Sequence, residues 1–287
     1  MKIIGFSRVR NEELLIADTV RHMEQHCDGL VFLDDSSSDG TVREIERVQT
    51  KVLAIVKSPH WELDRVAEET RHRKLLYAVA REFDPDWLFC FDADERFVGD
   101  VRQVLHSPAM ENADGVRVQL FDAYLSEQAQ SAYVAEMRLE DVDRMYGPER
   151  RDILMLWRNS DKFFYEGMDR REPVATSDAR IVTGPIYCKH FGKAVSVGQW
   201  EEACEYYATH FPEPYASKWT ARRGKAIHTM SDFGTPLYGW DQVHQHAVRI
   251  HPFEPVAADS RSFIGRARVF AIAQPWAGKV KALLARK

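Results

Sequence analysis

Four short apolar segments lie within the first 91 residues, and each is separated from the next by a stretch with helical periodicity. The segments cover residues 3–6, 30–33, 52–56 and 87–91. Between them, apolar side chains recur every three or four residues, as at Val42, Ile45 and Val48. Strands without a polar face are typical of parallel sheets that helices cover on both sides. We therefore predict an α/β fold with a Rossmann-like, mostly parallel central sheet flanked by helices, whose successive loops meet at the carboxyl edge of the sheet.

The alternation weakens after about residue 110. Further strands are expected at residues 116–120, 153–157 and 181–187. Before residue 110, helices are expected at residues 63–83 and 98–106. From residue 200 onward the chain is rich in Trp, Tyr, His and Arg and is expected to be mainly helical or irregular. The sequence contains no repeat and no linker typical of a boundary between independent domains. The second half is therefore expected to pack on the first as an extension.

The composition excludes several classes of protein. The chain has 287 residues, 45% of them hydrophobic, and a formal net charge of −5, so it can bury an ordinary core and has no general attraction for nucleic acid. Its four cysteines are far apart, which argues against a zinc ribbon or a disulfide framework and favours a reducing compartment. The apolar N-terminus is too short for a signal peptide, and no segment approaches the roughly 18 apolar residues of a membrane span. We expect a cytoplasmic protein without nucleic-acid partners.

Acidic residues directly follow two of the predicted strands. Asp34 and Asp35 come after residues 30–33, and Asp92-Ala93-Asp94-Glu95 comes after residues 87–91. At the carboxyl edge of a parallel sheet these acids would converge with the residues after the first strand. Mg²⁺ or Mn²⁺ held by one or two carboxylates completes its coordination with phosphate oxygens. The pattern therefore predicts a cleft for a metal and a phosphate; the alternative for each acidic loop is a solvated turn that caps the next helix.

Three stretches taken in order, SRVRNEELLI, FLDDSSSDGT and WLFCFDADE, resemble the successive signatures of family 2 glycosyltransferases with the A-type fold. The resemblance covers roughly residues 1–110. It implies an inverting enzyme that depends on Mn²⁺ or Mg²⁺ and transfers a sugar from a nucleoside-diphosphate sugar to a hydroxyl acceptor, a saccharide or glycolipid, as in polysaccharide biosynthesis. It also implies a nucleotide-sugar-binding half at residues 1–110, an acceptor or catalytic half at 111–195 and a mainly helical extension at 196–287.

The resemblance also implies roles for individual residues of the donor site. Asp34 and Asp35 would hold the base and ribose, and Asp94 would bind the metal, with Asp92 as a ribose or second metal partner. The loop that would wrap the nucleobase contributes Arg8, Arg10, Asn11 and Glu12. On the helix expected at residues 63–83, Arg71 and Lys74 would reach the nucleotide; the alternative is that this charged run is simply a solvated helix face.

Two later stretches extend the resemblance. FFYEGMDRREPV resembles a segment whose acid activates the acceptor hydroxyl, which implies Glu172 as the general base and Asp169 as the second candidate, although Arg171 stands where the pattern has His. YCKHFGK resembles a strand-terminal metal motif and implies His190 as a further metal ligand. Arg158 matches a basic position that could contact phosphate or acceptor. A surface ion-pair cluster around Glu172 and a hydrogen-bonded core histidine at position 190 are the alternatives.

The last third of the chain leaves more than one interpretation open. Its aromatic and basic side chains could form an acceptor platform, a core or a contact between identical subunits; they include Trp200, Tyr206, Tyr207, Trp219, Arg222, Arg223 and Trp240. Basic residues among apolar ones at positions 261–287 are compatible with peripheral contact with a membrane or with an ordinary surface helix.

Other functions fit the sequence less well. A nucleotidyltransferase would need a glycine-rich phosphate loop after the first strand, and SRVRNEE has no glycine. A phosphatase of the D-x-D-x-Thr type would have Thr where this chain has Arg96, and no G-x-G-x-x-G supports a dehydrogenase. A non-catalytic protein that binds a nucleotide sugar and serves in assembly remains the non-enzymatic alternative.

Overall fold

The computed structural model describes residues 1–58, 61–62, 64–168 and 170–250. Its first half contains β1 (Ile3–Val9), α1 (Ile16–His26), β2 (Gly29–Asp34), α2 (Thr41–Val48), β3 (Val52–Lys57), α3 (Arg65–Arg81), β4 (Trp87–Cys90), β5 (Glu95–Val98) and α4 (Val101–His106). Its second half contains β6 (Gly115–Tyr124), β7 (Met145–Arg158), β8 (Phe163–Phe164), β9 (Val174–Ala175), β10 (Ile181–His190), α5 (Val197–His210), α6 (Tyr215–Thr220), α7 (Trp240–Val243) and β11 (Val248–Ile250). Short 3-10 turns lie at Pro108–Met110, Leu139–Asp141 and His244–His246.

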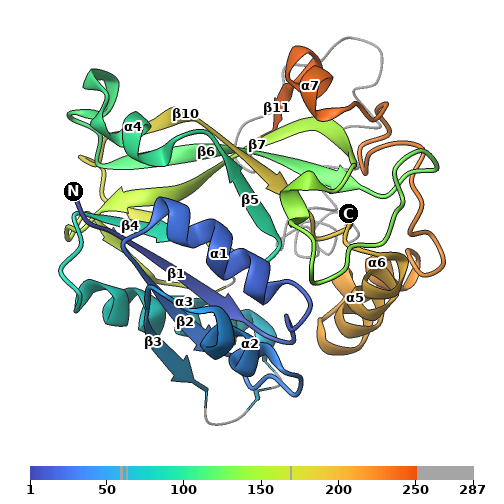
Figure 1. Ribbon diagram of the computed structural model, residues 1–287, viewed down its shortest axis with the longest axis horizontal. Helices are drawn as coiled ribbons and strands as arrows, with labels where there is room; N and C mark the ends of the chain where they lie inside the picture. Colours follow the sequence, from blue (N-terminus) through green and yellow to red (C-terminus); the bar gives the residue numbers. More distant parts are fainter. Residues whose placement is uncertain (59–60, 63, 169, 251–287) are drawn as a thin grey trace, which may run out of the picture.

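One curved sheet runs through the molecule in the order β3–β2–β1–β4–β7–β6–β10–β5, with β11 beside β7 (Figure 1). The strands β3, β2, β1 and β4 are parallel to one another, whereas β7 is antiparallel to both β4 and β6. Val9 is paired with Asp34 and Phe6 with Cys90, so β1, β2 and β4 end at the same edge. The predicted fold class is confirmed.

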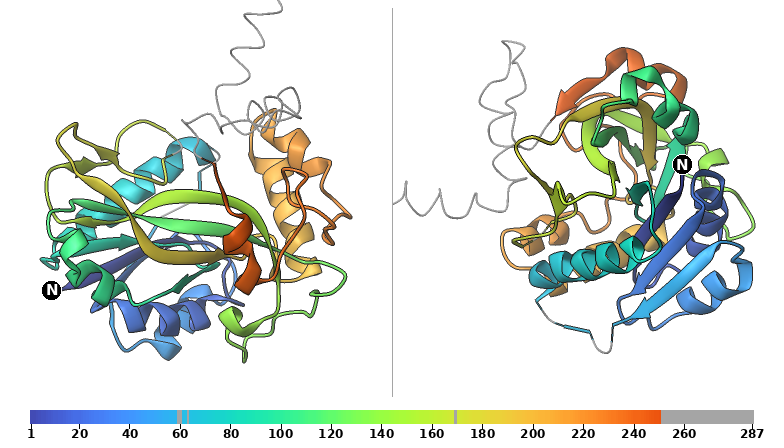
Figure 2. Two further views of the ribbon diagram at one scale, coloured as in Figure 1. Left: turned by 90° about the horizontal axis from the view of Figure 1, so that it is seen from above. Right: turned by 90° about the vertical axis from the view of Figure 1, so that its left-hand side faces the viewer.

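Helices cover both faces of the parallel part of the sheet (Figure 2). One face packs against apolar side chains of α1, α2 and α4, among them Ile16, Val20, Met23, Ile45, Val101 and Leu105. The opposite face packs against Leu76, Tyr77 and Ala80 of α3. Each set recurs at helical spacing, and for this reason the sequence pattern located these helices within a few residues.

Strand β5 was not expected. A helix was predicted from residue 98, but Asp100 caps α4 instead: its Oδ1 accepts a hydrogen bond from the backbone nitrogen of Gln103 at 2.9 Å. The chain before the cap is thereby free to pair with β10, where Glu95 lies opposite His190. The third acid of the DADE sequence is consequently a buried strand residue.

The sheet is continuous across residue 110, because β5 from the first half pairs with β10 from the second. Beyond the sheet, α5 and α6 pack on each other around Trp200, Cys204 and Trp219. These two tryptophans are therefore core residues. All four cysteines are buried and free.

None of the described helices is both long and apolar enough to cross a membrane. The segment considered for contact with a membrane surface, residues 261–287, lies outside the described residues.

Candidate functional site

The parallel pairing of β1 with β2 and β4 brings the two acidic turns to one edge of the sheet. Asp34 is the last residue of β2, and Asp35 follows it; the Asp92–Asp94 turn follows β4. The loop after β1 enters the same region, since the backbone nitrogen of Asp35 donates to the carbonyl oxygen of Val9 at 2.9 Å. The structure thus brings together the three stretches that carry the family resemblance.

Asp34 and Asp35 have different environments. Asp35 is completely buried and forms an ion pair with Arg65 of α3. Its other oxygen, Oδ1, lies 3.8 Å from Nδ1 of His72, and neither atom has a hydrogen-bond partner among the described residues. Asp34 accepts a hydrogen bond from the backbone nitrogen of Ser37 at 3.2 Å. A polar ligand or a water molecule would satisfy the orphaned atoms beside Asp35.

Burial lowers the pKa of His72 to about 4, and the nearby Arg8 guanidinium acts in the same direction. His72 is therefore a neutral imidazole at pH 7, in a position to exchange hydrogen bonds without adding charge.

The predicted nucleobase loop lies beside an aromatic side chain that sequence reasoning missed. Arg10 donates to the backbone oxygens of Asp35 and Ser36 at 2.7 and 3.0 Å. The guanidinium carbons of Arg10 and Arg65 both lie 4.9 Å from the centre of the Trp61 ring. Asn11, with a φ of 53°, ties this loop to the next turn, because its Oδ1 accepts from the backbone nitrogen of Ser38 at 2.8 Å.

Glu12 faces the acids of the second turn. Burial raises the pKa of Glu12 well above its ordinary value, and the carboxylates of Asp94 and Asp92 raise it further. Three carboxyl groups from two loops therefore share one electrostatic environment, and a cation placed among them would lower the energy of all three ionised forms.

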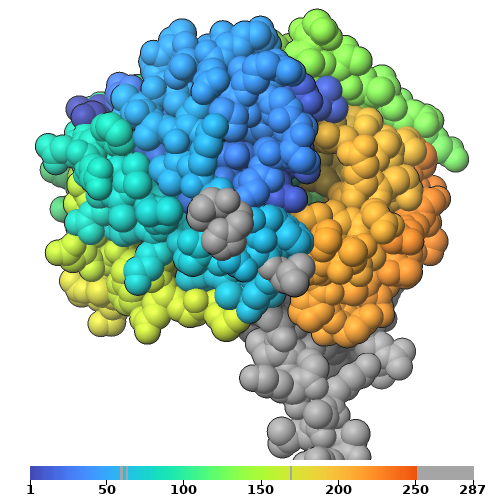
Figure 3. All heavy atoms as spheres, turned by 90° about the horizontal axis from the view of Figure 1, so that it is seen from below, coloured from blue at the N-terminus to red at the C-terminus, as the bar shows by residue number. Residues whose placement is uncertain are grey.

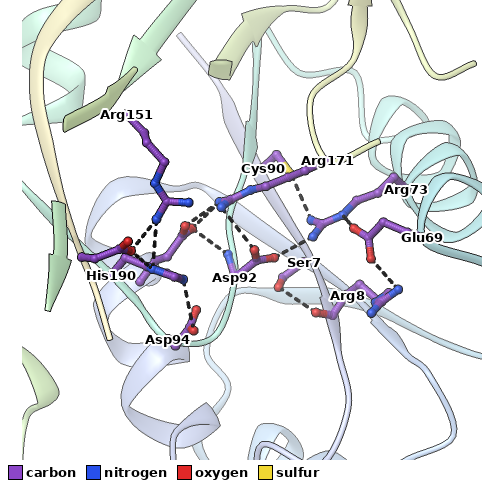
Figure 4. Close-up of polar contacts among 12 residues, drawn as sticks. Ser7, Arg8, Glu69, Arg73, Cys90, Asp92, Asp94, Arg151, Arg171 and His190 are labelled. Atoms are coloured by element: carbon purple, nitrogen blue, oxygen red, sulfur yellow. Dashed lines mark hydrogen bonds and ion pairs between the residues drawn. The ribbon is translucent and has the colours of Figure 1, made fainter. Parts of the chain in front are cut away.

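Asp92 is held by two arginines (Figure 4). Nη2 of Arg73 lies 2.7 Å from Oδ1 of Asp92, and Nη1 of Arg171 lies 3.4 Å from its Oδ2. Against the effect of burial, Arg171 and Arg73 lower the pKa of Asp92. Nη2 of Arg171 also donates to both carboxylate oxygens of the buried Glu95, at 2.6 and 2.7 Å. Asp92 is therefore ionised and committed to arginines in this structure.

Asp94 and His190, both expected to bind the metal, lie close together although they are far apart in the sequence. Nε2 of His190 is 3.4 Å from Oδ2 of Asp94, and its Nδ1 is 2.6 Å from Oδ1 of Asp122 on β6. Burial opposes protonation, but Asp94 and Asp122 raise the pKa of His190 to about 10. A histidine whose Nδ1 is held by a carboxylate and whose Nε2 points to a second carboxylate has the arrangement of a metal ligand with its supporting group.

The space around this pair fits a cation. A Cβ atom added to Gly192 would lie 2.7 Å from Oδ2 of Asp94 and 3.1 Å from Nε2 of His190, so the glycine keeps this cradle open. Within the described ranges, no group of three or more His, Cys, Asp or Glu side chains is arranged to hold a metal on its own. Two protein ligands agree with Mg²⁺ or Mn²⁺ sites that take the rest of their coordination from phosphate and water.

Helix α3 contributes different residues from those predicted. Arg71 is half exposed and donates to Glu68 at 2.6 Å, and Lys74 is exposed, so neither reaches the strand ends. The residues that do are Arg65, Glu69, His72 and Arg73, which recur with helical periodicity on the side that also carries Leu76. That spacing was the signal in the sequence: charged residues in register with the buried stripe face the sheet.

The candidate base and the candidate phosphate contact lie elsewhere. Oε2 of Glu172 accepts from Nη1 of Arg117 at 2.7 Å, whereas the preceding residue, Arg171, points to Asp92. Glu172 is thus not among the clustered acids, and Asp169 lies outside the described residues. Arg158 donates to the backbone oxygen of Ala113 at 2.8 Å and covers the Trp87 ring. Trp87 begins β4, so the prediction that Arg158 touches phosphate or acceptor is wrong: Arg158 is at the opposite edge of the sheet.

Helix α5 forms the other wall of the cleft. Tyr206 lies beside the guanidinium groups of Arg65 and Arg10, and the ring of His210 meets Trp61 edge to face with centres 4.8 Å apart. Burial raises the pKa of Tyr207, and the nearby Tyr215 and Asp94 raise it further.

Figure 3 shows the surface of α5 and α6 facing the N-terminal half across a recess. A groove of about 1180 Å³ lies between the start of α5 and the α1–α2 side of the N-terminal half, lined by residues that include Asn11, Arg21, Glu44, Arg47, Gln199 and Glu202. The acids at the strand ends are not among the described residues that line it.

Comparisons with known proteins give the following. No family model and no curated protein matches the chain. The structure is similar to S. aureus TarS, residues 1–349, in complex with UDP, at 11% identity and a TM-score of 0.40 over 77% of this chain and 71% of that one. It is also similar to glucosyl-3-phosphoglycerate synthase from Mycobacterium tuberculosis in complex with Mn²⁺, UDP and glucosyl-3-phosphoglycerate, at 19% identity and a TM-score of 0.30. That match covers 42% of this chain and 44% of the synthase chain.

The fold class rests on the strand order and on the placement of the acidic turns. A parallel β3–β2–β1–β4 sheet with both turns at its carboxyl edge, extended by the mixed β7–β6–β10–β5 part, is the A-type glycosyltransferase fold that the sequence resemblance implied.

Proposed function

We propose that the protein is an inverting glycosyltransferase that moves a sugar from a nucleoside-diphosphate sugar to a hydroxyl of a saccharide or glycolipid. The observation that carries the proposal is the meeting of the Asp34–Asp35 turn with the Asp94–His190 pair at one edge of the sheet. The first pair suits the base and ribose, and the second suits the diphosphate end of the same donor. Ligands of open α/β sheets bind at this carboxyl edge.

The chain's own residues divide the work on the donor. Arg10, Asn11 and the orphaned atoms of Asp35 and His72 supply hydrogen bonds for a base and ribose. Arg73 and Arg171 keep Asp92 ionised, so it can accept from a ribose hydroxyl. Asp94 and His190 would hold Mn²⁺ or Mg²⁺, which when bound neutralises the charge that develops on the leaving diphosphate. The α5 wall limits the access of water to the donor.

Inversion requires one displacement and a base on the acceptor side. Glu172 and Asp169 stay the candidates that the resemblance implies. Glu172 would first have to leave Arg117, since its carboxylate is committed to that guanidinium. Asp169 is therefore the better choice for the first variant.

Thermal-shift titration with UDP, GDP, dTDP and CDP, each with and without Mn²⁺, tests the donor site. A ligand that binds only the native state raises the melting temperature progressively above its dissociation constant. We expect one nucleotide to give a Mn²⁺-dependent shift that Asp94→Ala abolishes. The matched control is Asp161→Ala, which removes an exposed carboxylate that pairs with Arg81. No shift with any nucleotide at millimolar concentration overturns the proposal.

The titration identifies the nucleobase. Nucleoside-diphosphate sugars with that base would then be assayed for sugar transfer and for slow hydrolysis. The anomeric configuration of the product, measured by NMR, tests inversion directly. Nucleotide-sugar binding without transfer or hydrolysis would favour the non-catalytic alternative.

A further inference from the structure

A group of three cations comes from α6 and from the segments that follow β10 and α6. We call Lys193, Lys218 and Arg222 the α6 basic cluster. Nζ of Lys193 lies 2.7 Å from Oδ2 of Asp232 and 3.2 Å from Oδ2 of Asp122. Nη2 of Arg222 lies 2.7 Å from the same Asp232 oxygen. Lys193 and Arg222 thus share the Asp232 carboxylate, and the Asp122 carboxylate that Lys193 also contacts binds other cations as well.

Asp122 serves further cations. It pairs with Arg151 and accepts a contact of 2.6 Å from Nδ1 of His190. The acids near the α6 basic cluster are therefore already used, and the local sum of charges is positive.

Lys218 is the cation without a carboxylate. Among the residues that the structure describes, none places a carboxylate within 4 Å of its Nζ. This atom lies over the Tyr215 ring, 5.6 Å from the ring centre. Burial lowers the pKa of Lys218 to about 8, and the Arg222 and Lys193 charges contribute, partly offset by Asp232. A partly buried cation beside two others is unfavourable unless an anion joins it.

The cluster faces the reaction side of the cleft. Asp122 links Lys193 to His190, whose Nε2 faces Asp94. On the same wall as α6, Tyr207 of α5 lies near Asp94, and its ring centre is 5.7 Å from that of Tyr215.

The guanidinium of Arg222 is fixed over the Trp219 ring, 4.8 Å from its centre. Such stacking leaves the edge of a guanidinium available for hydrogen bonds to a phosphate or carboxylate.

We propose that the acceptor carries an acidic group, a phosphate or a carboxylate, which binds Lys218 and Arg222 while the acceptor's sugar ring packs on Tyr215. This inference rests on the proposed function, because it assigns the substrate class of the same cleft. An anionic group bound here would offset the charge of three cations. An acceptor without charge would gain nothing from them.

Calorimetric titration of the full chain at constant ionic strength tests this, with four probes: glucose 6-phosphate, glucuronate, glucose and inorganic phosphate. The variants are Lys218→Met and the control Lys225→Met, which removes the same charge from an exposed lysine whose Nζ donates to the backbone oxygen of Ala221 at 2.8 Å. We expect the sugar phosphate, the sugar carboxylate or both to bind at least about tenfold more tightly than glucose. Lys218→Met should weaken that binding by about tenfold and Lys225→Met should not.

The two anionic sugars distinguish a phosphate from a carboxylate acceptor. Equal binding of glucose and the anionic sugars overturns the inference, as does the absence of binding by both anionic sugars at millimolar concentration. Inorganic phosphate that binds as well as the sugar phosphate, and equally in Lys218→Met, also overturns it. Displacement of the anionic sugar by the nucleotide identified above would place it in the donor site and overturn it as well.

These probes are titrated into the protein alone, so the outcome is separate from that of the nucleotide panel. If a nucleotide binds and no anionic sugar does, the proposal of an acidic acceptor is wrong and the proposed transferase function stands. If an anionic sugar binds and no nucleotide does, the proposed donor site is wrong and α6 carries an anion site of another function.

Discussion

The Nη2 atom of Arg73 lies 2.7 Å from Oδ1 of Asp92, so a buried arginine of α3 holds the first acid of the D-x-D sequence. The same guanidinium reaches Glu69 through Nε at 2.9 Å, and Glu69 in turn pairs with Arg8 of β1 at 2.5 Å. Charges from β1, α3 and the turn after β4 thus alternate in one network. The network explains how several ionised groups can remain buried beneath the cleft.

Removal of Arg73 should cost far more stability than removal of its neighbour Arg71. Arg73→Met leaves buried carboxylates with one cation fewer, so we expect the free energy of unfolding to fall by about 3 kcal/mol. Arg71→Met removes a half-exposed pair with Glu68, and about 0.5 kcal/mol or less should be lost. Urea denaturation of the two variants measures the difference; equal losses would contradict a buried role for Arg73.

The two aspartates after β2 should differ in their contribution to stability, because Asp35 pairs with the buried Arg65. Asp34→Ala removes a carboxylate whose recorded hydrogen bond is the one from Ser37, so stability should change by about 1 kcal/mol or less while nucleotide affinity falls about tenfold. Asp35→Ala strands the buried Arg65, and we expect a loss of about 3 kcal/mol. Denaturation and nucleotide titration of both variants give the answer. A large destabilisation by Asp34→Ala would contradict this difference.

Gly192→Ala should disable the Asp94–His190 pair without unfolding the protein. The new Cβ would meet Oδ2 of Asp94 at 2.7 Å and must push the pair apart. The Mn²⁺-dependent part of the nucleotide shift should therefore disappear. Gly198→Ala is the control, since its Cβ would meet its nearest neighbour, Oγ of Ser196, at 3.8 Å. An unchanged Mn²⁺ effect in Gly192→Ala would exclude this cradle as the metal site.

His22 should make the protein less stable in mild acid. Burial lowers its pKa to about 3, with Arg96 acting in the same direction, whereas an unfolded histidine titrates near 6.5. Below about pH 6.5 the unfolded chain binds a proton that the native state refuses. The stability associated with neutral His22 is complete above that pH and is lost as the pH falls toward the folded pKa, by about 1.4 kcal/mol per pH unit.

Denaturation curves between pH 7 and pH 5.5 on wild type, His22→Gln and the exposed control His106→Gln measure this slope. The slope should decrease in His22→Gln, where the backbone nitrogen of Phe97 can still find an acceptor in place of Nε2. The same slope in all three proteins would mean that His22 is protonated in the native state.

Glu172→Gln should retain turnover, because its carboxylate is committed to Arg117. A general base contributes about 10²- to 10⁴-fold to the rate, so loss of the true base is easily detected. Asp169→Asn is expected to show that loss. The turnover numbers of both variants with the donor found above decide between them, and a 10²-fold drop in Glu172→Gln alone would return the base role to Glu172.

The sequence by itself determined the four parallel strands of the first half, the helices between them and the two acidic turns, but not β5. Residues 30–33 and 87–91 are apolar on both faces, so they could only be covered strands, and the acids that end them had to lie at the carboxyl edge. His190 was a candidate metal ligand because its motif resembles the family's strand-terminal one. These features depend on local patterns, and such patterns can be read along the chain.

Only the tertiary structure decided which charges meet in the cleft. Arg71 and Arg73 are alike in the sequence, but the rotation of α3 against the sheet turns Arg73 to Asp92 and leaves Arg71 half exposed. Glu172 and Arg171 are adjacent, yet the chain direction after β8 sends Arg171 to Asp92 and Glu172 to Arg117. The placement of α5 and Lys218 opposite Asp94 depends on packing between segments more than 100 residues apart, because side-chain contacts at that separation are set by the core and not by local propensity.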